Sequence, residues 1–336
     1  MHRPVVAVIG AGAIGQFYGA RLVRGGAEVR FLLRRDFAAV SRHGLVVRQT
    51  ATDQIEGSAD EPELHFAPDR FRACRTPAEC AAGAPVDWVL VALKTTALKT
   101  TALAEAAELI RPLLAPATRV VVMCNGLGIE EALAAQLGAE RLLGMLCFVC
   151  VNRRDDGVIE HLGHGRVGVG SLTGDQDACA ELERLCALGG IRCDRFASLL
   201  EARWRKLVWN VPFNGLCVAH DCGTDAILAD PALNRRARAL MEEVVAAGNA
   251  DLAAQGESGR IEPAWMDEQF RRTALMADYL PSTLIDVRAG RDIELDAMFR
   301  EPLARAGHRG IPTPELAALV AELAVKLPRL NGARRT

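Results

Sequence analysis

Short apolar runs alternate with longer amphipathic segments over the first part of the chain. The runs are typical of buried strands, and the segments between them have helical spacing. They lie at residues 4–9, 28–33, 87–93, 119–123, 142–151, 165–170 and 191–194. Strands that alternate with helices favour a mainly parallel, doubly wound sheet. The pattern therefore predicts an α/β fold for the N-terminal part.

The pattern changes near residue 197, after which almost every segment has helical spacing. Ser198 and Glu201 have the spacing of a capping box, which marks the start of a helix. Pro212 lies inside this helix, where we expect it to kink or weaken the helix. We therefore expect two domains, an N-terminal sheet domain at residues 1–196 and an all-helical domain at residues 197–336.

Composition narrows the classes of protein to which the chain can belong. Of its 336 residues, 50% are hydrophobic, which allows a large core, and the net charge is only −2. No basic field is available for nucleic acid or an anionic membrane, and no apolar run has the length of a membrane span. The ten cysteines are irregularly spaced and no export signal is recognised. We expect a cytoplasmic protein with free thiols.

A glycine-rich turn separates the first strand from the first helix. Gly10 permits the tight turn, Gly12 lets a pyrophosphate approach the backbone, and Gly15 lets helix and strand pack closely. The helix N-terminus offers free N–H groups to phosphates. The turn predicts a Rossmann-type dinucleotide site; the alternative is a tight turn that binds nothing. Its expected cofactor contacts are Gly10, Ala11, Gly12, Ala13, Ile14 and Gly15.

The end of the second strand indicates which dinucleotide binds. An NAD site usually has Asp or Glu there, whereas this strand ends in Leu33 and Arg34, and Asp36 comes later. An arginine at this place can pair with a 2′-phosphate. We expect NADP, as NADPH, to be the cofactor. The alternative is that Arg34 is only a solvated surface side chain.

Two polar clusters stand out in the helical part. Lys206, Asn210 and Asn214 are spaced i, i+4, i+8, so they share one helix face among apolar neighbours. Ser282 and Asp286 share a face of a later helix, which Gly290 ends and Glu294 follows. Each cluster could line a pocket. The structural alternative for the first cluster is a polar stripe whose hydrogen bonds are satisfied within the protein, and for the second it is a pair of helices with capping charges.

At these residues the sequence resembles the ketopantoate reductase (2-dehydropantoate 2-reductase) family. The glycine-rich turn, Arg34, Lys94 and Asn125 match its cofactor domain, and both polar clusters match its C-terminal signature. The motifs occur in the family's order from about residue 4 to about residue 315. The resemblance implies reduction of ketopantoate to (R)-pantoate, a step toward pantothenate and coenzyme A.

The resemblance also implies a role for each residue. Lys206 would be the general acid, and Glu294 would orient it and contact the cofactor. Lys94 and Asn125 would lie beside the nicotinamide. The contacts to the substrate, a small 2-oxo acid, would come from Asn210, Asn214, Ser282 and the position of Thr224.

Three departures leave the substrate open. Thr224 stands where well-studied members have asparagine, Ile285 where glutamine is common, and Gly215 where proline is common. A paralogue that reduces another 2-oxo acid is the first alternative. An NADP-binding regulator without turnover is the second, and retention of Lys206 and Glu294 speaks against it.

Two further motifs indicate packing rather than chemistry. Cys147 and Cys150 lie three apart in an apolar strand, where they would face opposite sides. His161 and His164 flank a glycine turn without further ligands. We expect no metal site. The helical domain could offer a face for a homodimer.

Overall fold

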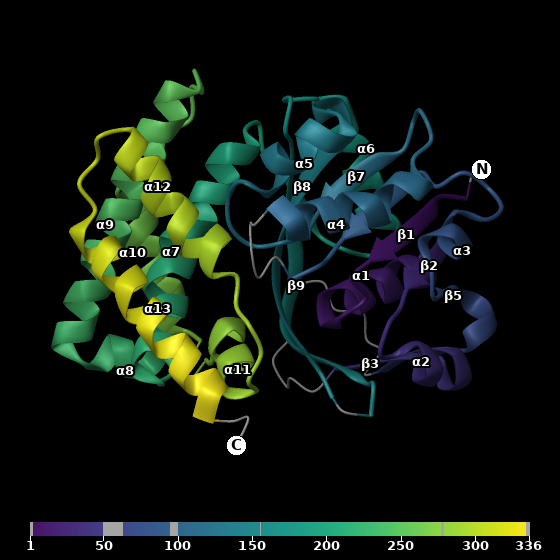
Figure 1. The fold of residues 1–336 in the computed structure, drawn as a ribbon, viewed down its shortest axis with the longest axis horizontal. Coiled ribbons are helices and arrows are strands. Elements are labelled where there is room, and N and C mark those ends of the chain that lie inside the picture. Colours follow the sequence, from purple (N-terminus) through teal and green to yellow (C-terminus); the bar gives the residue numbers. More distant parts are fainter. Residues whose placement is uncertain (1–2, 50–62, 95–99, 155, 277–278, 334–336) are drawn as a thin grey trace. The chain divides into compact units, whose positions relative to one another are not determined.

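The structure is a computed structural model that describes residues 3–49, 63–94, 100–154, 156–276 and 279–333. A sheet with flanking helices forms a first compact unit, which ends at Leu199 (Figure 1). The second unit begins at Leu200, is helical in its described part, and also includes Asn125–Gly128.

Ten strands form one sheet in the described part of the first unit. They are β1 (Val5–Ile9), β2 (Glu28–Leu32), β3 (Leu45–Gln49), β4 (Glu63–Phe66), β5 (Arg72–Cys74), β6 (Trp88–Val91), β7 (Arg119–Val122), β8 (Leu142–Arg153), β9 (Ile159–Ser171) and β10 (Cys193–Arg195).

The centre of the sheet is parallel and has the strand order β5-β2-β1-β6-β7-β8. This is the 3-2-1-4-5-6 order of dinucleotide-binding sheets, so the predicted doubly wound fold is confirmed. Beyond it, β9 runs antiparallel to β8, and β3, β4 and β10 extend that side. The sequence pattern missed β3, β4 and β5, because these strands are short and only partly apolar.

Helices cover both faces of the sheet. They are α1 (Ala13–Arg24), α2 (Phe37–His43), α3 (Pro77–Ala81), α4 (Thr100–Ile110), α5 (Ile129–Leu137), α6 (Gln176–Leu188), and the short 3₁₀ turns η1 (Pro68–Arg70), η2 (Arg111–Leu113) and η3 (Ala139–Arg141). The path from β1 to β2 and the path from β6 to β8 run in opposite directions from the centre. Because such crossovers are right-handed, α1 lies on one face and α4 and α5 lie on the other.

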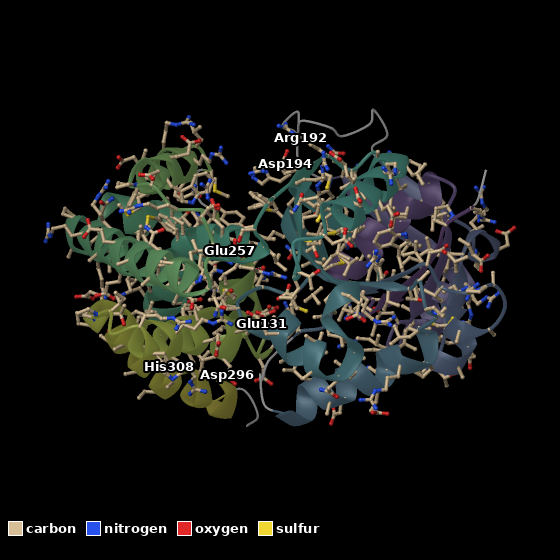
Figure 2. The ribbon with its side chains drawn as sticks, turned by 90° about the horizontal axis from the view of Figure 1, so that it is seen from above. Glu131, Arg192, Asp194, Glu257, Asp296 and His308 are labelled. Carbon is tan, nitrogen blue, oxygen red and sulfur yellow. The ribbon has the colours of Figure 1, made fainter. Side chains whose placement is uncertain are left out.

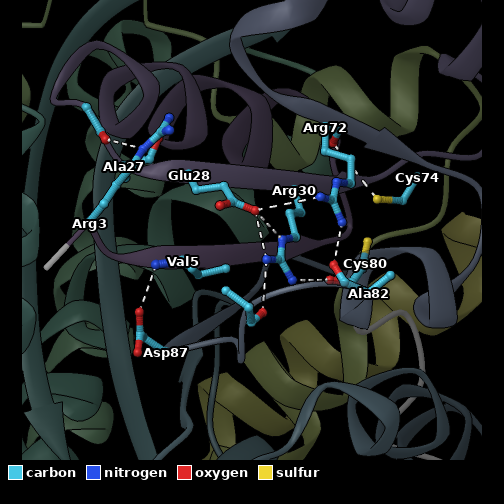
Figure 3. A network of polar contacts seen from close by, with 12 residues as sticks. Arg3, Val5, Ala27, Glu28, Arg30, Arg72, Cys74, Cys80, Ala82 and Asp87 are labelled. Carbon is cyan, nitrogen blue, oxygen red and sulfur yellow. Dashed lines mark hydrogen bonds and ion pairs between the residues drawn. The ribbon is translucent and has the colours of Figure 1, made fainter.

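A fully buried arginine fixes the segment that follows β5 to the sheet. Arg30, in the middle of β2, pairs with Glu28 and donates to the carbonyls of Cys80 (2.8 Å) and Ala84 (2.9 Å) (Figure 3). A buried charge is tolerated only when it is paired and hydrogen-bonded, and these contacts satisfy that condition. The guanidinium thereby holds α3 and its flanking loops against β2.

The second unit is built on a separate core. Its helices are α7 (Leu199–His220), α8 (Thr224–Ala229), α9 (Pro231–Ala254), α10 (Ala264–Ala274), α11 (Ser282–Arg288), the π turn η4 (Asp296–Arg300), α12 (Glu301–His308) and α13 (Pro314–Ala333). The core forms around Trp204, Phe213 and Phe299, which are fully buried. The helix α7 continues across Pro212, so the expected weakening does not end it; the missing N–H removes one bond from the helix.

Candidate active site

The glycine-rich turn has the shape of a phosphate cradle. Gly10 has φ +88°, and a Cβ on it would lie 2.7 Å from the backbone of Ala92 and Leu93. A Cβ on Gly15 would lie 2.6 Å from the Gly10 carbonyl oxygen, so both positions require glycine. Gly12 caps α1 and has nothing within 4 Å of its Cβ position. The open side of the turn therefore leaves room for a pyrophosphate at the N-terminus of α1.

In the turn after β2, two arginines are exposed and the only acid, Asp36, is paired with another residue. Arg34 and Arg35 are exposed, and neither forms a side-chain hydrogen bond with a described residue. Asp36 instead pairs with Arg153, at the end of β8, and accepts from Gln16 Nε2 at 3.2 Å. The carboxylate is thus engaged by protein donors, unlike an acid that binds the ribose hydroxyls of NAD.

Two more predicted residues follow the carboxyl ends of central strands. Lys94 follows β6 and is exposed, and Asn125 follows β7 and is half-buried. Ligands of doubly wound sheets bind outside this edge. Both side chains therefore start from the edge where the nicotinamide is expected.

The predicted stripe lies on α7, and two of its members contact other segments of the second unit. Lys206 Nζ donates to Asn125 Oδ1 at 2.9 Å. Asn214 Nδ2 contacts Met298 Sδ at 3.4 Å, and a thioether is a weak acceptor. Asn210 is only 5% exposed and has no side-chain hydrogen bond to any described residue. Amides with weak or absent protein partners in a largely buried place need another partner, and a bound ligand could supply it.

The Asn125 loop packs directly on η4, the π turn that follows Glu294. A Cβ on Gly126 would lie 2.5 Å from Ala297, and the Leu127 N–H donates to the Ala297 carbonyl at 3.0 Å. Glu294 is buried, and its carbonyl accepts from the Met298 N–H. Figure 2 labels Asp296, the first residue of this turn. The turn thus joins the segment that carries Glu294 to the loop that carries Asn125.

Ser282 and Thr224 occupy different environments. Ser282 is the first residue of α11 and is exposed. Thr224 is 0% exposed, and both its N–H (3.1 Å) and its hydroxyl (3.3 Å) donate to the Tyr279 carbonyl. Thr224 therefore anchors the segment that leads to Ser282. A direct contact of Thr224 with substrate stays a prediction.

Asn214 and its neighbour Gly215 lie where the packing is tight. A Cβ on Gly215 would lie 2.6 Å from the Leu319 side chain and 3.0 Å from Phe299. Glycine here lets α13 and η4 approach α7 closely. This packing gives a structural reason for the glycine that follows the stripe.

The two motifs set aside in the sequence lie in packed surroundings. His161 is buried beside Phe17 and contacts the His164 carbonyl at 2.7 Å, and burial lowers the pKa of His161. Cys147 is buried and Cys150 half-buried on β8. No group of three or more metal-binding side chains was found among the residues that the structure describes.

A cavity of about 360 Å³ lies away from these residues. It is lined by Asp87, Trp88, Arg119 and side chains of α6. These residues mark the amino ends of β6 and β7, whereas ligands of this fold bind at the carboxyl ends. We therefore place the candidate site by its side chains and not by this cavity.

Several residues of the site had no signal in the sequence. Asp36 and Arg153 are 117 residues apart, and nothing local marks them as a pair. Met298 and Ala297 look like ordinary helix residues, and the π turn gives them their contacts. Only knowledge of the fold could have identified them.

Comparison with known proteins agrees with this geometry. The family described as "Ketopantoate reductase PanE/ApbA" matches residues 6–174, and its C-terminal domain matches residues 198–326. A 2-dehydropantoate 2-reductase of Nostoc sp. is 32% identical over 100% of this chain and 98% of its own.

No helix among the described residues is long and apolar enough to cross a membrane.

Solved structures resemble the chain over its length. The 2-dehydropantoate 2-reductase of Geobacter metallireducens has a TM-score of 0.83 and 39% identity, covering 95% of this chain and 99% of its own. A D-mandelate dehydrogenase solved with NADH and anilino(oxo)acetate has a TM-score of 0.81 at 19% identity, covering 97% and 99%, which shows the fold alone. From the domain matches and the full-length relatives, the chain belongs to the ketopantoate reductase family.

Proposed function

We propose that the chain reduces 2-dehydropantoate to (R)-pantoate with NADPH. The observation that carries the proposal is the contact between Lys206 Nζ and Asn125 Oδ1, 2.9 Å apart. Asn125 lies in the loop after β7, and ligands of such sheets bind beyond the carboxyl ends of the strands, so this contact ties the ammonium group to a loop proposed to border the cofactor. When bound, the nicotinamide supplies the hydride.

Lys206 completes the reaction as the proton donor. Hydride addition to the 2-oxo carbon creates an alkoxide, which needs both charge stabilisation and a proton. A protonated lysine supplies both, and Asn125 holds the amine in place. Glu294, on the segment fixed by η4, is the carboxylate proposed to orient the lysine and contact the cofactor.

The remaining polar groups are proposed to bind the substrate and cofactor. Asn210, Asn214 and Ser282 donate to the carboxylate and hydroxyl of the oxo acid, and Lys94 lies beside the nicotinamide. Thr224 acts at the same site, with its hydroxyl on Tyr279. On this proposal residues 1–196 hold the dinucleotide and residues 197–336 hold the oxo acid. A homodimer and a cytoplasmic location stay predictions.

NADP is proposed over NAD because of the turn after β2. Arg34 is exposed and has no side-chain partner among the residues that the structure describes, and Asp36 is engaged by Arg153. Replacement of Arg34 by alanine should weaken NADPH binding about ten- to a hundred-fold, since a hydrogen bond to a charged group contributes about 1.5–3 kcal/mol. NADH binding should be almost unchanged. Quenching of protein fluorescence measures the dissociation constants for NADPH and NADH. An equal loss of affinity for both cofactors would contradict the proposal.

A different 2-oxo acid is the second candidate substrate. The D-mandelate dehydrogenase mentioned above shares the fold, so the fold by itself fixes neither substrate nor cofactor. The buried Thr224 hydroxyl, committed to Tyr279, favours a pocket that differs from that of well-studied members.

One assay separates these candidates. Oxidation of NADPH is followed at fixed enzyme concentration with ketopantoate and with a panel of straight, branched and aromatic 2-oxo acids. We expect the highest kcat/KM with ketopantoate. A higher value with another acid would move the assignment to that acid, and no turnover with any acid would favour a non-catalytic regulator.

A further inference from the structure

A second arginine lies beside the turn that carries Arg34. Arg75 directly follows β5, which pairs in parallel with β2. The hydrogen bonding between the two strands extends one residue beyond β2, because the Leu33 N–H donates to the Cys74 carbonyl at 2.9 Å. Arg75 directly follows β5, and Arg34 lies two residues after the end of β2, so both arginines follow the same carboxyl edge of the sheet on adjacent strands.

An aromatic ring holds the Arg75 side chain against this turn. The guanidinium carbon of Arg75 lies 4.0 Å from the centroid of the Phe37 ring. Phe37 belongs to the same turn as Arg34, since its N–H donates to the Arg34 carbonyl at 3.3 Å. Arg75 is exposed and forms no side-chain hydrogen bond or ion pair with a described residue. One face of the guanidinium is thus covered by the ring, and its donors are not used by the described protein.

The backbone at Arg75 is also fixed. Its N–H donates to Glu79 Oε2 at 2.8 Å, and the Glu79 N–H donates to Thr76 Oγ1 at 3.2 Å. These bonds cap α3, which Arg30 holds against β2 (Figure 3). A fixed backbone and a stacked side chain reduce the entropy that Arg75 loses when it binds a ligand.

We propose that Arg75 is a second specificity residue for the adenosine 2′-phosphate, positioned by Phe37. An arginine presents a planar fork of donors that matches a phosphate, and stacking fixes the plane of that fork. Arg34 and Arg75 approach the phosphate from adjacent strands, while Arg153 neutralises Asp36, the acid of this turn. The inference rests on the proposed preference for NADP.

Binding of nucleotide fragments tests the proposal without turnover. Titration calorimetry measures the dissociation constants of adenosine 2′,5′-bisphosphate and of 5′-AMP. The proteins compared are wild type, Arg75→Ala, Phe37→Leu, Arg34→Ala and Arg42→Ala. Arg42 is the matched control, because it removes the same charge from an exposed position at the far end of α2. Thermal unfolding shows which variants keep the wild-type fold.

The expected pattern is specific for the 2′-phosphate. Arg75→Ala should weaken the bisphosphate about ten-fold, and Phe37→Leu about two- to five-fold, the size of a cation–π contact. Binding of AMP should change less than about two-fold in both variants, the range expected for surface charges. Arg75→Lys should recover part of the loss, because it restores the charge without the planar fork.

Failure of this proposal can be told from failure of the proposed cofactor. If wild type binds the bisphosphate no better than AMP, the NADP preference is wrong, and the role of Arg75 falls with it. If wild type discriminates and Arg34→Ala loses the discrimination, but folded Arg75→Ala behaves like Arg42→Ala, only the role of Arg75 is overturned.

Discussion

Replacement of Lys206 by alanine is expected to lower kcat about 10²–10⁴-fold, the usual contribution of a general acid. Lys206 is the cation that contacts the Asn125 loop, and its loss removes both the proton and the positive charge that stabilise the alkoxide. Affinity for NADPH should stay within about three-fold of wild type, because the contacts proposed for the 2′-phosphate come from the turns after β2 and β5 and do not involve Lys206. Steady-state kinetics and cofactor titration measure the two effects.

Lys326→Ala provides a matched control for the loss of a half-buried lysine. Its Nζ donates to the Ala219 carbonyl at 2.8 Å, near the C-terminal end of α7. Ala219 is thirteen residues from Lys206, or about 20 Å along the helix axis. We expect near wild-type kcat for this variant. A Lys206→Ala enzyme with similar kcat would refute the assignment of the proton donor.

A double mutant extends this test to Glu294. The single variant Glu294→Ala should also lower kcat, because the carboxylate is proposed to orient Lys206. If the two residues act as a unit, the double variant loses less than the product of the single losses. Strict multiplication would mean that Glu294 acts independently of the lysine.

Replacement of Asp251 by alanine is expected to destabilise the second unit by about 3–5 kcal/mol, since it breaks a buried ion pair. Asp251, on α9, is 1% exposed and accepts from the indole N–H of Trp204 on α7 at 3.1 Å. It also accepts from Arg305 on α12 (3.2 Å) and from Arg309, which directly follows α12 (3.0 Å). We expect the lower end of this range, because Arg309 is 31% exposed, so water can solvate its guanidinium when the carboxylate of Asp251 is removed.

Urea unfolding followed by tryptophan fluorescence measures this change. Three of the four tryptophans, Trp204, Trp209 and Trp265, lie in the second unit. Asp267→Ala is the control, because Asp267 pairs with Arg238 but is 72% exposed. Its loss should cost less than about 1 kcal/mol. Equal effects of the two substitutions would mean that the Asp251 network does not stabilise the unit.

The same network predicts how stability depends on pH. Burial raises the pKa of Asp251, but the hydrogen bonds from Arg309, Trp204 and Arg305 outweigh it, so the pKa is lowered. A lowered pKa contributes stability that is present above the unfolded value, about 3.9, and is lost as pH falls through the folded value. The difference in unfolding free energy between wild type and Asp251→Asn should therefore shrink below about pH 4.

Most of the fold could be predicted from short patterns in the sequence. The glycine-rich turn and the apolar runs of the central strands are short patterns, so the parallel sheet and its first crossover could be predicted from them. In contrast, β5 has only three residues, Arg72–Cys74, and its place beside β2 depends on tertiary contacts. Arg30 could not be predicted as a core residue, because this charged side chain is fully buried in a strand with the help of carbonyl partners fifty or more residues away.

The candidate site divides in the same way. The helical spacing of Lys206, Asn210 and Asn214 could be recognised in the sequence, and α7 carries all three. The contacts that orient them come from Asn125 and Met298, which are distant in the chain. Thr224 was selected because it aligns with a substrate contact, but alignment could not indicate that its hydroxyl binds Tyr279.

The π turn at Asp296–Arg300 makes the length of its segment part of the site. A π turn closes i→i+5 hydrogen bonds where an α-helix closes i→i+4, so it contains one extra residue. Deletion of one residue would let the turn become α-helical, and would rotate Glu294 by about 100° relative to α12. The carboxylate would then lie at another angle to the Asn125 loop, which packs on this turn, even if every side chain of the site were kept. We therefore expect an insertion or deletion in this segment to lower activity much as substitution of Glu294 does.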